Sequence, residues 1–313
     1  MRQFHRQMSR VALCGLLGGC AVVSACGCRL SGAAKPIPLT TSGRPPAAKP
    51  EPPRDRVLQV AIAPVISPQE TLFAYKDLVA FIGEAVRRPA RVIQRRSYAE
   101  TNEVLRRGVC DLAFVCSLAY VRGQEEFGME PLVIPQVAGK TTYQCYIIVP
   151  ARSPARKLTD LRGKSFAFVD PLSNSGWLAP VAMVRKLGRT PERFFSKTIY
   201  TYSHDNSIRA VATALVDGAA VDSLVYHYLA RRTDGVSGTR ILVSSEPFGI
   251  PPVVVPPGLN ETLKAELRTA FLTMHQSERG RRILAELLID RFLPRSATDY
   301  TSIRTRLEAE ERS

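Results

Sequence analysis

Short apolar runs alternate with longer stretches of helical apolar spacing from residue 57 of this chain onward. Residues 57–63, 90–94 and 111–115 are rich in β-branched and other apolar side chains, and their lengths are typical of strands. Residues 69–86 carry apolar side chains on one side of a helix, and a capping box at residues 97–100 opens another. This alternation predicts a largely parallel α/β sheet.

The same alternation returns after residue 150 and predicts a second α/β unit. Strands are expected at residues 165–169, 198–200, 219–222 and 240–243, and helices at 175–187, 206–216 and 223–231. Apolar runs at 132–137 and 143–149 are expected to end the first unit, and a strand at 250–255 to return to it before a helical tail at 261–287.

Two α/β domains joined by two crossovers, near residues 149 and 251, follow from this order. Lobe 1 is expected to comprise residues 57–149 plus 252–313, and lobe 2 residues 150–251. Such an arrangement is a clamshell whose ligand lies between the lobes.

The N-terminus has the features of an export signal rather than of a folded segment. Three arginines precede an apolar stretch at residues 11–23 that is too short to span a membrane comfortably. The sequence Val-Ser-Ala-Cys ending at Cys26 resembles a bacterial lipobox, with Cys20 as an alternative lipidation site and an ordinary cleaved signal as the other interpretation. Residues 1–25 are therefore expected to be a lipoprotein signal peptide, and the Pro-rich residues 26–56 a solvated tether.

The charge distribution argues against a nucleic-acid partner. The chain has a net charge of +15, but residues 1–56 contain nine Lys or Arg against two acidic residues, so the remainder is only mildly basic. It lacks a dense basic run interleaved with aromatic residues.

Beyond the leader and tether the cysteines are Cys110, Cys116 and Cys145, an odd number without zinc-ligand spacing. A metal, a cofactor and a disulfide framework are therefore not expected.

Residues 170–177, Asp-Pro-Leu-Ser-Asn-Ser-Gly-Trp, join the end of a predicted strand to the start of a predicted helix. Ser173, Asn174 and Ser175 are suited to cap that helix. Their free donors, with the exposed backbone N–H groups and the positive end of the helix dipole, could instead bind an anion. The pattern alone leaves both interpretations open.

Several strings in the body resemble the phosphate, phosphite and phosphonate binding proteins of bacterial ABC importers, the PhnD-like group. They are Ala-Pro at 63–64, Arg-Ser-Tyr-Ala-Glu at 96–100, Asp-Leu-Ala-Phe at 111–114, residues 170–176, Ser-His-Asp-Asn-Ser at 203–207 and Val-Asp-Gly-Ala-Ala-Val-Asp-Ser at 216–223. The resemblance implies a two-lobed periplasmic binding protein of type II. It also implies that Ser173, Asn174 and Ser175 hold a phosphorus oxyanion, although Thr is more usual where Asn174 stands.

Four further site residues are implied by the same resemblance. Tyr98 and Tyr143 would donate hydroxyl hydrogen bonds from the first lobe, although each could instead be a half-buried core tyrosine. His204 would donate to the anion, and its alternative is a cap-region residue without a ligand. Asp222 would accept from a protonated oxyanion or an amino substituent, and its alternative is a structural ion pair.

The function implied is that of an exported, lipid-anchored substrate-binding protein. It would capture phosphonate, phosphite or phosphate at the periplasmic or extracytoplasmic face and deliver it to an ABC permease and its ATPase. A sensory module of the same fold, signalling through a separate membrane receptor, is the alternative. An enzyme is not expected, because the sequence has no G-x-S-x-G elbow and no metal triplet. Which phosphorus oxyanion is bound stays open, because Asn174 departs from the family pattern.

Overall fold

A computed structural model describes residues 56–232 and 234–312. The predicted signal peptide, the candidate lipid-bearing cysteines Cys20 and Cys26, and the tether up to residue 55 lie outside the described residues. Within them, no helix is long and apolar enough to cross a membrane.

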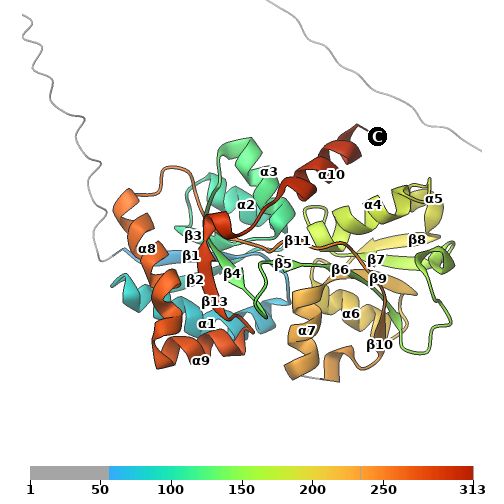
Figure 1. The fold of residues 1–313 in the computed structure, drawn as a ribbon, viewed down its shortest axis with the longest axis horizontal. Helices are drawn as coiled ribbons and strands as arrows, with labels where there is room; N and C mark the ends of the chain where they lie inside the picture. The colour runs from blue at the N-terminus through green and yellow to red at the C-terminus, as the bar shows by residue number, and fades with distance from the viewer. Residues whose placement is uncertain (1–55, 233, 313) are drawn as a thin grey trace, which may run out of the picture. The chain divides into compact units, whose positions relative to one another are not determined.

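A six-stranded mixed sheet forms the first lobe (Figure 1). Its strands, in spatial order, are β13 (Arg291–Pro294), β4 (Glu130–Gln136), β12 (Val253–Val255), β3 (Leu112–Phe114), β1 (Leu58–Ile62) and β2 (Ala90–Gln94). Strand β1 is parallel to β2 and β3, whereas β12 and β13 run antiparallel to their neighbours. The helices of this lobe are α1 (Pro68–Ala85), α2 (Tyr98–Arg106), α3 (Ser117–Phe127), α8 (Glu261–Thr273) and α9 (Glu278–Glu286).

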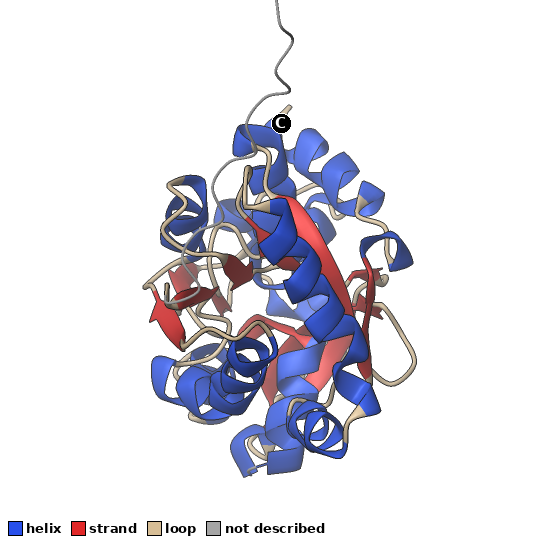
Figure 2. Ribbon diagram, turned by 90° about the vertical axis from the view of Figure 1, so that its left-hand side faces the viewer, coloured by secondary structure: helices blue, strands red, loops and turns tan. Residues whose placement is uncertain are grey.

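Alternate residues of β1 explain why helices cover both faces of this sheet. Leu58, Val60 and Ile62 pack with apolar residues of α1, α8 and α9. Ala61, which points the other way because strand side chains alternate, packs with residues of α2 and α3. Figure 2 shows helices on more than one side of the strands.

A five-stranded sheet forms the second lobe (Figure 1). Its strands, in spatial order, are β10 (Thr239–Ser244), β6 (Cys145–Pro150), β9 (Gly218–Asp222), β7 (Ser165–Phe168) and β8 (Lys197–Tyr200). The helices are the π-helical turn η2 (Asn174–Leu178), α4 (Ala179–Arg185), α5 (Pro191–Phe194), α6 (His204–Ala212) and α7 (Ser223–Arg232). Short 3-10 turns complete the described chain at Leu158–Leu161, Asp234–Val236, Met274–Gln276 and Arg295–Ala297.

Strand β6 corrects one expectation. The run at residues 143–149 was expected to end the first unit, but Cys145–Pro150 pairs with β9 and β10 in the second sheet. An apolar strand buried on both faces fits the interior of either sheet, so its pattern does not show which sheet it joins. The crossover therefore precedes Cys145 instead of lying near residue 149.

The two crossover segments pair with each other. Strand β5 (Thr142–Tyr143) runs antiparallel to β11 (Phe248–Gly249), and both lie between the larger sheets in Figure 1. The chain then re-enters the first sheet through β12, which lies between β3 and β4. A short two-stranded ribbon thus joins the lobes.

The C-terminal helix α10 (Thr301–Glu311) contacts both lobes. Its buried Ile303 and Leu307 belong to an apolar cluster that includes Ala113 of the first sheet and Phe166 of the second. Cys110, Cys116 and Cys145 are free and buried.

Candidate functional site

The candidate site lies where strands of both sheets end. Parallel strands β7, β8 and β9 end at Phe168, Tyr200 and Asp222, and the segments after them lead into η2, α6 and α7. Strand β3 of the other lobe leads into α3 in the same way. In α/β sheets the carboxyl ends of strands are where ligands bind, because loops and helix N-termini meet there.

Ser173 and Ser175 have different roles although both are completely buried. The Ser173 hydroxyl accepts a hydrogen bond of 2.9 Å from the Gly176 backbone N–H and thereby caps the turn. The Ser175 hydroxyl is buried without a hydrogen-bond partner. A Cβ at Gly176 would lie 2.5 Å from the Val169 Cβ, so glycine lets this turn pack against the strand end. Ser175 therefore presents a free donor from a rigid turn.

Asn174 links η2 to the first lobe and the crossover. Its side-chain nitrogen donates to the Tyr143 hydroxyl at 3.0 Å, and its backbone N–H lies 3.4 Å from the Cys116 sulfur. The Tyr143 oxygen also lies 2.7 Å from the Ser117 hydroxyl. The Asn174 amide therefore positions Tyr143, while its Oδ1 is buried without a partner.

Tyr98 is the first residue of α2 and is 0% exposed. Its backbone N–H donates to the Asp170 carboxylate at 3.1 Å, which joins the two lobes. Its hydroxyl is buried without a partner. Burial raises the pKa of Tyr98 well above the ordinary value, and the nearby Cys116 and Asp170 raise it further, so the phenol keeps its proton and can donate.

A hydrogen bond joins the backbone of Asp222 to the side chain of His204. The Asp222 backbone N–H donates to the His204 Nδ1 at 3.0 Å. Burial lowers the pKa of His204 to about 3, so the imidazole is neutral at pH 7. With Nδ1 accepting, the proton of the neutral ring is on Nε2, which makes Nε2 a donor.

Asp222 is a carboxyl group whose protonation is balanced near neutral pH. Burial raises its pKa to about 7, although the backbone hydrogen bonds from Leu224 and Val225 favour the ionised form. The Leu224 bond is 2.6 Å long. Within the described part of the chain, no ion pair involves Asp222. The ion pair that was the alternative to a ligand role is thus not formed there.

Tyr143 lies elsewhere than expected, and three residues that were not predicted contact the expected site residues. Tyr143 was expected on the first lobe but belongs to β5, in the crossover ribbon. Asp170, Cys116 and Ser117 contact the expected residues although the sequence did not single them out. Asp170 lies in the string at 170–176, and Ser117 opens the helix after a predicted strand. Both could have been predicted as site residues from their positions just after strands.

The chemistry of this cluster suits an anion more than a metal. Its potential donors are the neutral Tyr98, Ser175 and His204 side chains, and no Lys or Arg is among the residues placed there. Among the described residues, no group of three or more His, Cys, Asp or Glu could hold a metal ion. Uncharged donors in a water-excluded cluster stabilise an oxyanion through hydrogen bonds.

Comparison with known proteins identifies the family. The model of the family described as "ABC transporter, phosphonate, periplasmic substrate-binding protein" matches residues 60–300. Phosphate-import protein PhnD of Mycolicibacterium smegmatis is 29% identical over 232 residues, which cover 71% of this chain and 67% of that protein.

Two solved structures show the same fold. A binding protein component of an ABC phosphonate transporter from Pseudomonas aeruginosa has a TM-score of 0.76 at 20% identity, covering 82% of this chain and 87% of its own. PhnD1 from Prochlorococcus marinus, solved in complex with methylphosphonate, has a TM-score of 0.73 at 17% identity, covering 82% and 99%. With the family match over most of the body, these findings mean that the chain belongs to the periplasmic substrate-binding proteins of phosphonate ABC transporters, which bind their substrates and are not enzymes.

Proposed function

We propose that this protein captures a small phosphorus oxyanion, namely a phosphonate, phosphite or phosphate, and delivers it to an ABC permease and its ATPase. One observation carries the proposal: the Tyr98 and Ser175 hydroxyls are fully buried and have no hydrogen-bond partner. Buried polar groups are nearly always paired, so two orphaned donors at the strand ends call for an acceptor. The names of the relatives, one for phosphate import and one solved with methylphosphonate, support this ligand class.

The proposed site combines hydrogen-bond donors with one carboxyl group, Asp222, that can be either ionised or protonated near neutral pH. Tyr98, Ser175 and the His204 Nε2 donate to the oxyanion. Ser173 caps the turn that carries Ser175, and Asn174 holds the Tyr143 side chain beside the ligand. Asp222, whose pKa is about 7, accepts from a protonated oxyanion or donates when it is itself protonated. Each hydrogen bond to the charged ligand stabilises the complex by about 1.5–3 kcal/mol.

Ligand binding is proposed to favour the closed arrangement of the two lobes. Tyr98 belongs to the first lobe, and Ser175 and His204 to the second. A ligand that contacts both lobes shifts the population toward the form in which these residues are close together. The permease would then recognise that form.

Membrane attachment is a separate part of the proposal and rests on the sequence of the leader. Acylation at Cys26, or at Cys20 as the alternative, would hold the protein at the extracytoplasmic face. Mass spectrometry of membrane-extracted protein is expected to show the lipid on Cys26. A soluble, unmodified form would contradict this part and leave the ligand proposal intact.

Calorimetric titration of the purified protein tests the ligand class. Phosphate, phosphite and methylphosphonate are the ligands, and sulfate is the control because it is a tetrahedral oxyanion that carries no proton at neutral pH. Saturable binding of at least one phosphorus oxyanion is expected. Absence of binding for all three at millimolar concentration would overturn the assignment.

A further inference from the structure

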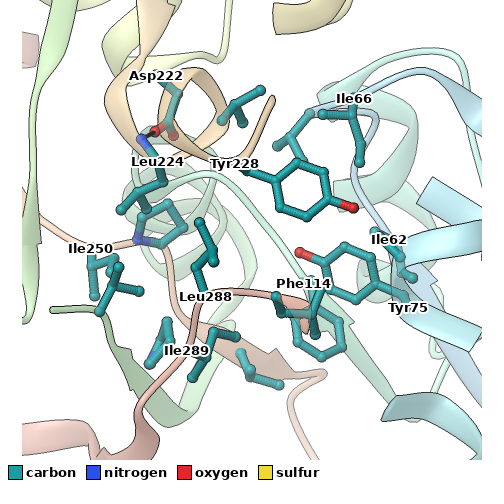
Figure 3. Close-up of a pocket in the computed structure, with 18 of the residues that line it drawn as sticks. Ile62, Ile66, Tyr75, Phe114, Asp222, Leu224, Tyr228, Ile250, Leu288 and Ile289 are labelled. Atoms are coloured by element: carbon teal, nitrogen blue, oxygen red, sulfur yellow. Dashed lines mark hydrogen bonds between the residues drawn. The ribbon is translucent and has the colours of Figure 1, made fainter. Parts of the chain in front are cut away.

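An apolar cavity of about 170 Å³ lies between the lobes and has Asp222 of the polar cluster in its wall (Figure 3). Helix α1 of the first lobe contributes Ala74 and Tyr75, and α7 of the second contributes Leu224 and Tyr228. The crossover segment contributes Ile250, and the segment after α9 contributes Leu288. The cavity is therefore built from both lobes and from the segment that joins them.

Polar groups reach this cavity at few points. Asp222 lies at one side of it in Figure 3, and the hydroxyls of Tyr75 and Tyr228 lie together at another. The Tyr228 hydroxyl is buried without a partner, and burial raises the pKa of Tyr75 to about 12. Most of the wall is aliphatic or aromatic carbon, so the cavity favours an apolar group over water.

Asp222 borders both the cavity and the polar cluster. Its backbone N–H bonds to His204, and its carboxyl group raises the pKa values of Tyr98 and Tyr143 in the cluster. The same carboxyl group raises the pKa of Tyr75 in the cavity wall. Asp222 is therefore the residue at which the polar cluster adjoins the cavity wall.

We infer that the cavity receives an apolar organic substituent of the ligand, so that the preferred substrates are phosphonates carrying an aryl ring or an alkyl chain of about six carbons. The inference rests on the proposed function, because it assumes that the oxyanion lies in the polar cluster. A cavity of about 150 Å³ lined by apolar side chains is known to bind benzene, so this cavity of about 170 Å³ has room for one aromatic ring. Burial of the substituent provides affinity that phosphate and methylphosphonate cannot obtain.

Comparison of phenylphosphonate with methylphosphonate on the unaltered protein tests this inference. Both carry the same charged group and differ only in the apolar substituent. Calorimetry is expected to show that phenylphosphonate binds about tenfold more tightly or better. Equal or weaker binding of phenylphosphonate, or no binding of either phosphonate, would overturn the cavity inference. The proposed function would fall only if phosphate and phosphite also failed to bind.

A pair of variants on helix α1 tests whether the preference for phenylphosphonate depends on the cavity. Ala74 lines the cavity, whereas Ala80 lies on the exposed side of the same helix. Ala74→Phe is expected to lower the ratio of phenylphosphonate to methylphosphonate affinity about tenfold, and Ala80→Phe is expected to leave that ratio unchanged. Ala74→Leu fills less volume and replaces Ala74→Phe if thermal melting shows that the larger side chain prevents folding. An unchanged ratio in a folded Ala74 variant would contradict the inference.

Discussion

Ser175 is the residue that separates ligand binding from helix capping. Its hydroxyl is buried and unpartnered, so Ser175→Ala removes a donor that makes no bond within the described protein. We expect the variant to bind methylphosphonate about 10- to 100-fold more weakly, because one hydrogen bond to a charged group is lost. Its free energy of unfolding should be unchanged or slightly higher, since a buried orphaned hydroxyl has been removed. Calorimetry and urea denaturation measure the two quantities.

Ser173→Ala is the matched control two positions earlier. The Ser173 hydroxyl accepts from the Gly176 N–H, so its loss should lower stability by about 1 kcal/mol. If Ser175→Ala behaves like Ser173→Ala, with lost stability and unchanged affinity, then Ser175 belongs to the cap and not to the binding site.

Asp222 and His204 give opposite pH dependences to stability. Burial raises the pKa of Asp222 to about 7, so between about pH 4 and 7 the folded protein keeps a proton that the unfolded chain releases, and stability falls as pH rises. Burial lowers the pKa of His204 to about 3, so between about pH 3 and 6.5 the unfolded chain binds the extra proton, and stability rises with pH.

Asp222→Asn removes only the first of these contributions. The stability of the variant minus that of the unaltered protein should therefore increase from pH 5 to pH 8, by roughly 2–3 kcal/mol. Urea denaturation at both pH values measures this difference. A difference that does not change with pH would mean that Asp222 has an ordinary carboxyl pKa in the folded protein.

The residue types of the site could be predicted, but their bonding could not. Ser175 and Ser173 are the same residue type two positions apart, yet one is orphaned and the other is a cap. The orientation of the Asn174 side-chain amide depends on Tyr143, a residue 31 positions earlier. A pairing between residues so far apart in the chain depends on the tertiary fold, which local sequence does not encode.

At the scale of elements, we expect helix α10 to be held more by its apolar side than by its ion pairs. Leu307 is buried in the cluster shared by both sheets, whereas Glu310 forms a partly buried ion pair with Arg185 at 2.6 Å. Leu307→Ala should lower the free energy of unfolding by about 2–4 kcal/mol. Glu310→Gln should cost about 1 kcal/mol or less, because partly exposed ion pairs contribute little. Urea denaturation compares them, and a larger loss from Glu310→Gln would show that the ion pair holds the helix.

Elements with strong periodicity were predictable, and those defined by partners were not. The helix expected at residues 69–86 is observed as Pro68–Ala85, because one apolar side and a proline at its start specify it locally. Strand β6 was assigned to the wrong unit, since its apolar pattern fits the interior of either sheet. The two-residue strands β5 and β11 carry no pattern of their own and exist only because the crossovers meet.

At the scale of the whole molecule, bonds between the lobes should set the affinity without contacting the ligand. The Asp205 carboxylate accepts from the Ser67 N–H at 3.0 Å, and beside it the His204 N–H donates to the Val65 carbonyl at 2.9 Å. These bonds join the start of α6 in the second lobe to the segment before α1 in the first. Because apparent affinity scales with the fraction of closed molecules, loss of such a bond weakens binding.

Asp205→Ala should therefore open the ligand-free protein and lower methylphosphonate affinity about tenfold. Small-angle X-ray scattering should show a larger radius of gyration for the ligand-free variant and the ordinary value at saturating ligand. Asp217→Ala is the control, because Asp217 accepts from the Ser165 N–H and hydroxyl within the second lobe alone. It should lower stability without changing the radius or the affinity. An affinity loss in Asp205→Ala without a larger ligand-free radius would mean that Asp205 acts on the ligand itself and not on closure.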